Sequence, residues 1–347
     1  MAFLNEAELA SLRIEQSVFH VVGPGEEHFQ LLAAFDAGPH EPFFLGRVRS
    51  VNGGNRYEFL EDAPVRAQLA RINSDPNAFQ DESEKLATAF NQAHGGSAAV
   101  GAFLIVVLSC EGGRLFALLK FEDEKVLTYD FVLARSGKPR PTFGEIQRTF
   151  VQNRNALQKA ALIRLGRQHD DICVVDRQNP QRPAAYFEQF LLARRQRTEE
   201  ELTKVIVEVT RNVAQKHKAA LPEATMRSLA QRLYDATRSG GSVDGDNAGV
   251  WLRSIFGPLP DDSPVLKDFA AGLKREGMAG ESFVLQKDAI PAPKNRRVET
   301  VSGVKLTFPV SLKQSVVSVN RRKGEIIIRD QITLDDIELP SAARARS

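Results

Sequence analysis

The sequence has 347 residues, of which 42% are hydrophobic and 26% are charged, as is typical of a globular protein. This length predicts two domains, or one large domain with an appendage, and a sizeable core. Two isolated cysteines, Cys110 and Cys173, exclude a disulfide framework and a cysteine-rich zinc site. The first twelve residues lack a signal-peptide pattern, and no apolar run is long enough to span a bilayer. We therefore expect a soluble cytoplasmic protein without membrane insertion.

Charge is distributed unevenly along the chain, although the net charge is only +2. The segment Met1–Asp62 has ten acidic and four basic residues. The segment Lys287–Lys323 has nine basic and two acidic residues. Such asymmetry points to a polyanion as the partner of the basic end.

The first half of the chain alternates strand and helix patterns. We expect strands over Arg13–Val22 and Pro42–Val51, and helices over Pro64–Ile72 and after Asp75-Pro76. Three strands follow, joined by short connections that favour an antiparallel meander: Val100–Cys110, Arg114–Glu122 and Val126–Leu133. Further strands are expected over Ile146–Gln152, Ala161–Leu165 and Ile172–Val175.

Near Pro183 the pattern of apolar and polar residues changes to one that predicts helices. Thr198-Glu199-Glu200-Glu201 matches a capping box at the start of an amphipathic helix. Further helices are expected from Pro222 to Arg238 and over Val250–Phe256 and Val265–Lys274. After Glu281 the period returns to two, and Val316–Val319 and Glu325–Arg329 predict a hairpin.

These patterns predict an α+β protein. It has an N-terminal α+β domain with a mixed or antiparallel sheet (1–182), a helical region (183–280), a small basic β subdomain (281–340) and a disordered tail (341–347).

The turn of the C-terminal hairpin is the main candidate binding site. Arg321, Arg322 and Lys323 place three cations together, where they can neutralise DNA phosphates. The preceding loop adds three more candidates: Lys294, Arg296 and Arg297. The alternative is a solvated turn that keeps the protein soluble and blunts an edge strand.

Two further basic clusters are weaker candidates, for which a solvated surface is the favoured interpretation. One comprises Arg194, Arg195 and Arg197, and the other comprises Arg135, Lys138 and Arg140 in a Gly/Pro-rich loop. One Trp and four Tyr occur in the whole chain, which argues against a stacking platform for single strands and for contact with a duplex backbone.

We expect no catalytic site, no metal site and no cofactor. The histidines are scattered, and neither a P-loop nor a G-x-S-x-G elbow occurs. His20 is expected to be a hydrogen-bonded core residue, and His169-Asp170-Asp171 a turn. A weak alternative is a Mg²⁺-dependent nuclease that uses Glu122, Asp123 and Lys125, which would need another acid nearby.

Several segments, taken in order, resemble the 37-kilodalton nucleoid-associated protein family of bacteria. The similar segments are IEQSVFHVV (14–22), SAAVGAFLIVVLSCEGGRLFALLKFE (97–122), AALIRL (160–165), DICVVD (171–176), the capped helix after Phe187–Phe190, and SVVSVNRRKGEIIIRD (315–330). The resemblance covers most of the chain and implies a cytoplasmic, nucleoid-associated protein that binds double-stranded DNA with little sequence preference. The family has no sharply defined catalytic residues, so the resemblance implies none here.

Our leading hypothesis is non-enzymatic DNA binding through phosphate contacts. The alternatives are the nuclease, a DNA-binding role in phage or mobile-element defence, and a protein-interaction scaffold. In the scaffold, the basic segment meets an acidic protein or the acidic face of another copy, so a homo-oligomer is also considered.

Overall fold

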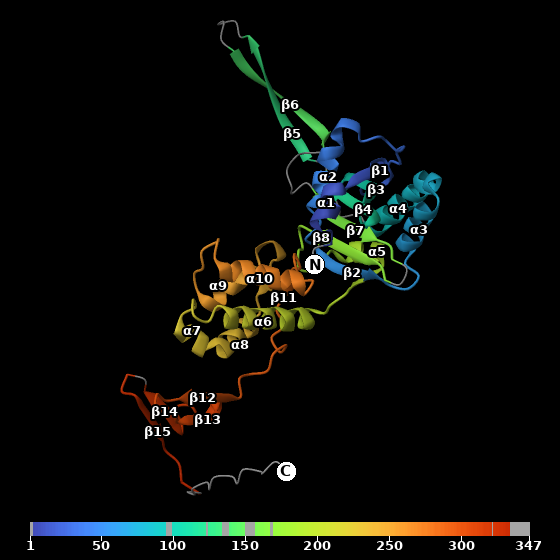
Figure 1. The fold of residues 1–347 in the computed structure, drawn as a ribbon. Coiled ribbons are helices and arrows are strands. Elements are labelled where there is room, and N and C mark those ends of the chain that lie inside the picture. Colours follow the sequence, from blue (N-terminus) through green and yellow to red (C-terminus); the bar gives the residue numbers. More distant parts are fainter. Residues whose placement is uncertain are drawn as a thin grey trace. The chain divides into compact units, whose positions relative to one another are not determined.

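The computed structural model describes residues 3–94, 99–122, 124–133, 139–149, 157–166, 169–320 and 322–333; for 94, 124–133 and 139–149 it describes the backbone alone. Contacts divide the chain into two compact units, Met1–Ile290 and Pro291–Ser347 (Figure 1). The fold is α+β, as the sequence predicted, with an antiparallel N-terminal sheet, helices in the middle and small C-terminal hairpins. The finer division at residues 182 and 280 stays a prediction, and the predicted tail lies outside the described residues.

A seven-stranded sheet forms the centre of the first unit. Its strand order is β1-β3-β4-β7-β8-β2-β9, and every neighbouring pair is antiparallel. The strands are β1 (Arg13–Val22), β2 (Asn55–Phe59), β3 (Gly101–Cys110), β4 (Gly113–Phe121), β7 (Leu157–Arg164), β8 (Asp171–Asp176) and β9 (Ala193–Arg195).

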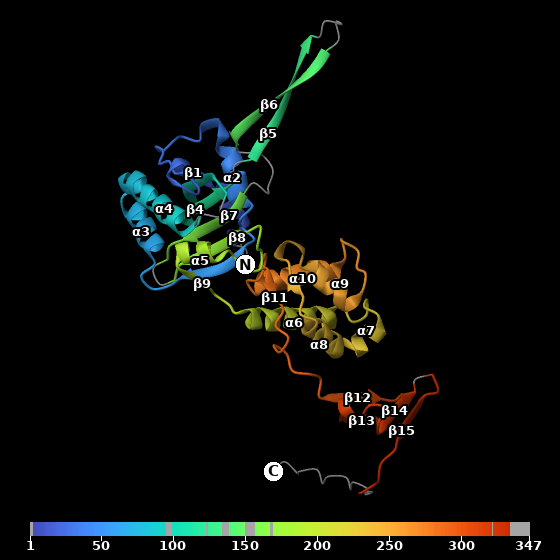
Figure 2. The same cartoon turned by 180° about the vertical axis from the view of Figure 1, so that it is seen from behind.

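Helices cover both faces of this sheet. On one face pack α3 (Pro64–Ser74), α4 (Phe79–His94) and α5 (Ala185–Leu191). On the other pack α1 (Glu6–Ser11) and α2 (Glu41–Arg49). Figures 1 and 2 show the sheet between the two groups. Because both faces are covered, β3 needs apolar side chains on each, which explains its nearly continuous apolar run.

The prediction of a strand over Pro42–Val51 was wrong, because this segment forms α2. Pro42 lies in the first turn of the helix, where its missing N–H costs no hydrogen bond. Phe44, Leu45 and Val48 are buried against the sheet at helical spacing. The strand that the sequence did not reveal is β2, which lies between β8 and β9.

The predicted meander is also wrong in its third strand. β5 (Glu124–Leu133) does not join β4; instead it pairs with β6 (Pro139–Thr149) in a separate two-stranded ribbon. The neighbour of β4 is β7, which follows the ribbon in the chain. Local periodicity predicted the strands but not this long-range pairing.

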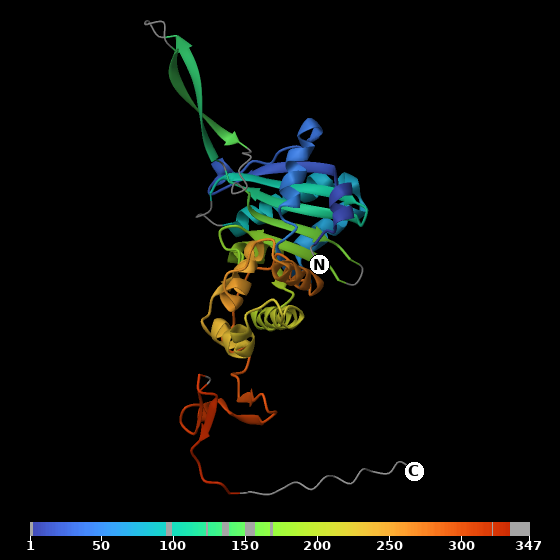
Figure 3. The same ribbon diagram turned by 60° about the vertical axis from the view of Figure 1, so that its left-hand side comes forward.

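The helical region has a core of its own. It is built from α6 (Glu199–Lys216), α7 (Glu223–Arg227), α8 (Leu229–Arg238), α9 (Gly249–Phe256), α10 (Pro264–Arg275) and the strand pair β10 (Ser242–Val243) and β11 (Phe283–Val284). Figure 3 shows these helices, coloured yellow to orange, as one group. The helix expected over 222–238 is broken at Ser228 into α7 and α8. None of the helices that the structure describes is long and apolar enough to cross a membrane.

The second unit consists of two short hairpins. β12 (Asn295–Glu299) pairs with β13 (Lys305–Pro309), and β14 (Val317–Asn320) pairs with β15 (Glu325–Ile328). Within the described residues of this unit, only Phe308 and Val317 are buried apolar side chains. With so small a core, most of the residues described in this unit are exposed to solvent.

Candidate nucleic-acid interface

The turn between β14 and β15 has a backbone that is fixed by one side chain. Asn320 Oδ1 accepts hydrogen bonds from the backbone amides of Arg322 and Lys323, each at 3.2 Å. Gly324 closes the turn with φ of 69°, a left-handed conformation that favours glycine. Asn320 pairs with Glu325 at the last rung of the ladder. These contacts hold Arg322, Lys323 and Gly324 in a turn at this end of the hairpin.

Arg322 and Lys323 are exposed on this turn. Neither forms an ion pair with any carboxylate of the described residues. Arg321, the third cation of the predicted site, lies outside the described residues. Two exposed cations on adjacent residues, without an internal counter-charge, leave their full charge available to an external anion.

The cations of β12 are arranged differently. Arg297 and Lys305 share one carboxylate, Glu299, at 3.7 and 3.6 Å. Arg296 lies opposite the buried Phe308 in the ladder. Because side chains alternate along a strand, Arg296 and Arg297 project from opposite faces. The two therefore cannot contact one flat surface, and Arg297 is partly neutralised.

Three further exposed cations have no ion pair within the described part of this unit: Lys294, Lys313 and Arg329. Lys313 and Arg329 were not predicted as site residues, since neither belongs to a basic cluster in the sequence. Residues 291–333 contain nine basic and three acidic residues in all. Their sole aromatic residue is Phe308, which is 5% exposed, so this stretch has no aromatic side chain on which a base could stack.

The predicted cluster of Arg194, Arg195 and Arg197 belongs to the first unit and is engaged within the protein. Arg194, which is exposed, pairs with Glu58 at 2.8 Å. Arg195 pairs with Glu281 and donates to the carbonyl of Ser282 at 2.8 Å. Arg197 donates to the carbonyl of Glu276 at 2.6 Å. These arginines connect β9 and the following loop to distant parts of the unit.

A comparison with known protein families tests the family resemblance that the sequence segments suggested. Residues 46–335 match the family model NA37, nucleoid-associated protein YejK. The chain belongs to this family. No curated protein gives a significant match. The matched range includes every strand of the seven-stranded sheet except β1, together with the helical region and both hairpins of the second unit.

In this member of the NA37 family, the predicted nuclease residues are only partly described. Glu122 follows β4, and its Oε1 lies 3.5 Å from Gln178 Nε2. Asp123 and the side chain of Lys125 lie outside the described residues, as do Arg135, Lys138 and the side chain of Arg140. Among the residues described, no three His, Cys, Asp or Glu side chains gather as metal ligands would. The nuclease thus stays a sequence-based alternative.

The histidine of β1 has the structural surroundings that the sequence predicted. His20 is fully buried; its Nδ1 accepts from the Leu32 amide at 3.1 Å, and its Nε2 lies 3.3 Å from Ser83 Oγ. Burial lowers the pKa of His20, against an opposing effect of Glu84. His20 is therefore a neutral core residue rather than an exposed ligand.

The segment before β8 is likewise held by internal contacts. Asp170 pairs with Arg66 and accepts from the Gly166 amide at 3.0 Å. Asp171 pairs with Arg56 at 3.3 Å. Asp171 is the first residue of β8, so the predicted turn over His169-Asp170-Asp171 stays a prediction, and both carboxylates of the segment are engaged by arginines within the protein.

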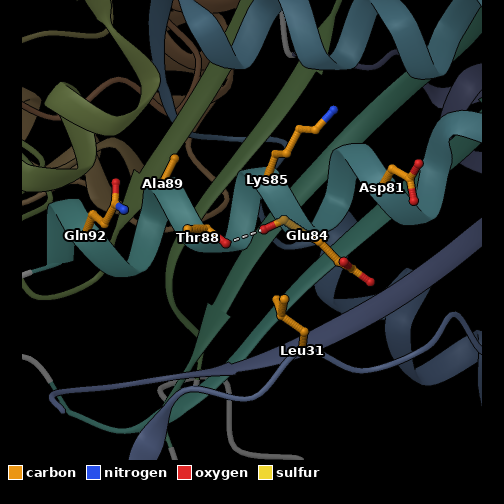
Figure 4. A pocket seen from close by; sticks show the side chains of 7 residues that line it. All are labelled: Leu31, Asp81, Glu84, Lys85, Thr88, Ala89 and Gln92. Carbon is orange, nitrogen blue, oxygen red and sulfur yellow. Dashed lines mark hydrogen bonds between the residues drawn. The ribbon is translucent and has the colours of Figure 1, made fainter. Parts of the chain in front are cut away.

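A shallow hollow of about 510 Å³ lies along α4 in this NA37-family chain (Figure 4). Asp81 and Glu84 supply carboxylates to its lining, and Lys85 supplies the one cation among the lining residues. Thr88 turns its hydroxyl back to the Glu84 carbonyl at 2.8 Å. The lining has no excess of positive charge, so the hollow does not fit a phosphate.

Proposed function

We propose that the chain binds double-stranded DNA with little sequence preference, and that it does so through phosphate contacts of the second unit. Membership of a nucleoid-associated family supports a role at DNA. The observation that carries the proposal is the turn Asn320–Gly324, which exposes Arg322 and Lys323 without a neutralising carboxylate among the described residues. Each phosphate that a cation neutralises releases counterions, which favours binding at low salt.

The chemistry of the cations supports a preference for the duplex backbone over bases. A site for single strands needs aromatic faces, whereas residues 291–347 contain one aromatic residue, the buried Phe308. Contacts to phosphate position a protein on DNA but carry no sequence information directly. Arg321, Lys294 and Arg296 are proposed as additional contacts on the basis of charge, and Arg297, which projects from the other face of β12 and shares Glu299 with Lys305, as a weaker one.

The first unit contributes less to the proposed surface. Of the cluster Arg194, Arg195 and Arg197, Arg194 is the member with an exposed side chain, and we propose it as a secondary contact. Arg195 is largely buried and paired, so moving it toward DNA would leave Glu281 without its partner.

The salt dependence of binding to a duplex tests the proposal. Fluorescence anisotropy between 50 and 200 mM salt should give a steep fall in affinity for the parent protein. The double variant R322A/K323A should reduce the log–log slope by about 1.8, that is, about 0.9 for each lost contact. A matched control is K204A/R211A, which removes two exposed cations that α6 carboxylates already pair. Equal slopes for both double variants would remove the turn from the binding surface.

A further inference from the structure

Strand β15 is an unprotected edge of the second unit. It pairs with β14 and with no other described strand (Figure 1). Its segment Ile326–Ile328 consists of isoleucines, of which Ile327 and Ile328 are 40% and 55% exposed. Soluble proteins usually protect such edges with lysine, proline or a bulge, and none of these interrupts β15. Because a hairpin of two strands is at best marginally stable in water, a further strand at this edge would stabilise the unit.

The hydrogen bonds of the hairpin determine which backbone groups this edge presents. The Arg329 amide donates to the Val316 carbonyl at 3.0 Å, so these two residues form a hydrogen-bonded pair at the end of the ladder. In an antiparallel ladder, hydrogen-bonded and non-hydrogen-bonded pairs alternate. The amide and carbonyl groups of Ile326 and Ile328 therefore point away from β14. No residue of the described chain forms a hydrogen bond with them.

The sequence of this edge is complementary to itself. Glu325 and Arg329 flank the three isoleucines, and both are exposed without an ion pair to any described residue. When two copies pair antiparallel about Ile327, each Glu325 lies opposite Arg329 of the other copy. A parallel pairing in register would place like charges side by side, which destabilises a strand pair, whereas facing opposite charges stabilise it. The charges therefore select one orientation and one register.

We propose that two copies of this chain associate through their β15 edges and form one four-stranded antiparallel sheet in the order β14-β15-β15-β14. The backbone groups of Ile326 then exchange hydrogen bonds with those of Ile328 of the other copy. Ile327 faces its own copy at a non-hydrogen-bonded position, where facing side chains are closest. The interface is isologous, so association closes at two copies. Such a dimer forms without DNA and carries two Asn320–Gly324 turns.

Charge reversal tests the register and leaves the isoleucines unchanged. Sedimentation equilibrium of the full chain without DNA should show a species of twice the 38.4-kDa mass as the protein concentration rises. E325R and R329E should each weaken dimerisation about tenfold or more, because both facing charge pairs become repulsive. The double variant E325R/R329E restores opposite charges at both pairs and should dimerise as the parent does.

K313E is the matched control for R329E. Lys313 is also exposed and has no ion pair within the described part of the unit, but it lies outside β15. Its reversal changes the net charge equally and should leave dimerisation unchanged. A parent that stays monomeric, equal weakening by K313E and R329E, or a double variant as weak as the single ones would overturn the proposal.

The two-fold position permits a covalent test. Facing residues at a non-hydrogen-bonded position have Cα atoms about 4.5 Å apart, within the range of a disulfide. In a C110S background, I327C should therefore form a disulfide between copies on mild oxidation, since the remaining Cys173 is buried. Ile328 is more exposed, but its two copies occupy diagonal positions about 7–8 Å apart, so I328C should cross-link much less. Equal cross-linking of the two variants would contradict the register.

A proline separates the outer edge from the hairpin itself. Ile328 directs its amide outward, so I328P removes a donor from the interface and none from the ladder with β14. It should abolish dimerisation, while its circular dichroism matches that of the parent at a dilution where the parent is monomeric. An I328P variant that dimerises as the parent does would show that β15 is not the interface.

Discussion

Arg195, on the last strand of the sheet, forms an ion pair with Glu281, which precedes β11 of the helical region. Both side chains are largely buried, with 14% and 3% of their surfaces exposed. Glu281 also accepts from the Arg56 amide at 3.1 Å, and Arg195 donates to the carbonyls of Gln181 and Ser282. The pair therefore joins the sheet to the helical region within the first unit.

Removing the carboxylate should destabilise the first unit strongly. Glu281→Ala leaves the Arg195 guanidinium buried without its counter-charge, which costs about 3–5 kcal/mol of the free energy of unfolding. Urea unfolding measures the loss. Arg194→Ala is the matched control, because its exposed pair with Glu58 should contribute less than about 1 kcal/mol. Comparable losses for the two variants would show that burial does not increase the contribution of the Arg195–Glu281 pair to the free energy of unfolding.

A close backbone approach predicts a second sensitive position next to this pair. Gly280 has φ of 84°, and a Cβ there would lie 2.4 Å from backbone atoms of Gly53. Gly280→Ala should cost about 3 kcal/mol or more, since left-handed strain and overpacking add. Gly257 has φ of 89° and ψ of −167°, a conformation that few residues besides glycine adopt, but no atom lies within 4 Å of a Cβ there, so Gly257→Ala should cost only the backbone strain, about 1–3 kcal/mol. Thermal unfolding that ranks the two variants equally would contradict the steric argument.

Sequence patterns that depend on neighbouring residues were predictable, and long-range ones were not. The capping box of α6 is present: Thr198 Oγ1 accepts from the Glu201 amide at 3.2 Å, and Glu201 Oε2 accepts from the Thr198 amide at 2.8 Å. The C-terminal hairpin also follows from its own alternation. The pairing of β4 with β7 depends on residues that the whole ribbon separates, so no local period could reveal it.

The candidate site also has a part that local sequence patterns predict and a part that depends on long-range contacts. Exposure of Arg322 and Lys323 follows from a turn that Asn320 and Gly324 define locally. Whether Arg195 is paired within the protein depends on Glu281, which is 86 positions away. From sequence alone, the cluster around Arg195 and the cluster at the hairpin turn both look like runs of adjacent cations. Tertiary pairing therefore decides which cations an external anion can use.

The buried histidine predicts a specific loss of stability in acid. His20 has a pKa below its ordinary value of 6.5, because burial disfavours its charged form. The unfolded chain takes up the proton first as pH falls below about 6.5, so this contribution to stability is complete above that pH. It declines between 6.5 and the lower folded-state pKa, by up to about 1.4 kcal/mol per pH unit.

Urea unfolding of the parent and of His20→Gln at pH 7.5 and 5.5 isolates this effect from that of other titrating groups. The substitution should cost more stability at pH 7.5 than at pH 5.5, because glutamine does not titrate. A cost that is the same at both pH values would show that His20 does not carry the acid sensitivity.

The turn residue Asn320 permits a test in which no charge changes. Asn320→Ala removes the acceptor for the amides of Arg322 and Lys323 but keeps both cations. We expect affinity for duplex DNA to fall about fivefold, because about 1 kcal/mol of ordering in the turn must then be supplied on binding. The salt slope should stay that of the parent, since the number of phosphate contacts is the same. Ser318→Ala on the same strand is the control, and binding by Asn320→Ala that equals it would mean that the cations act without a fixed turn.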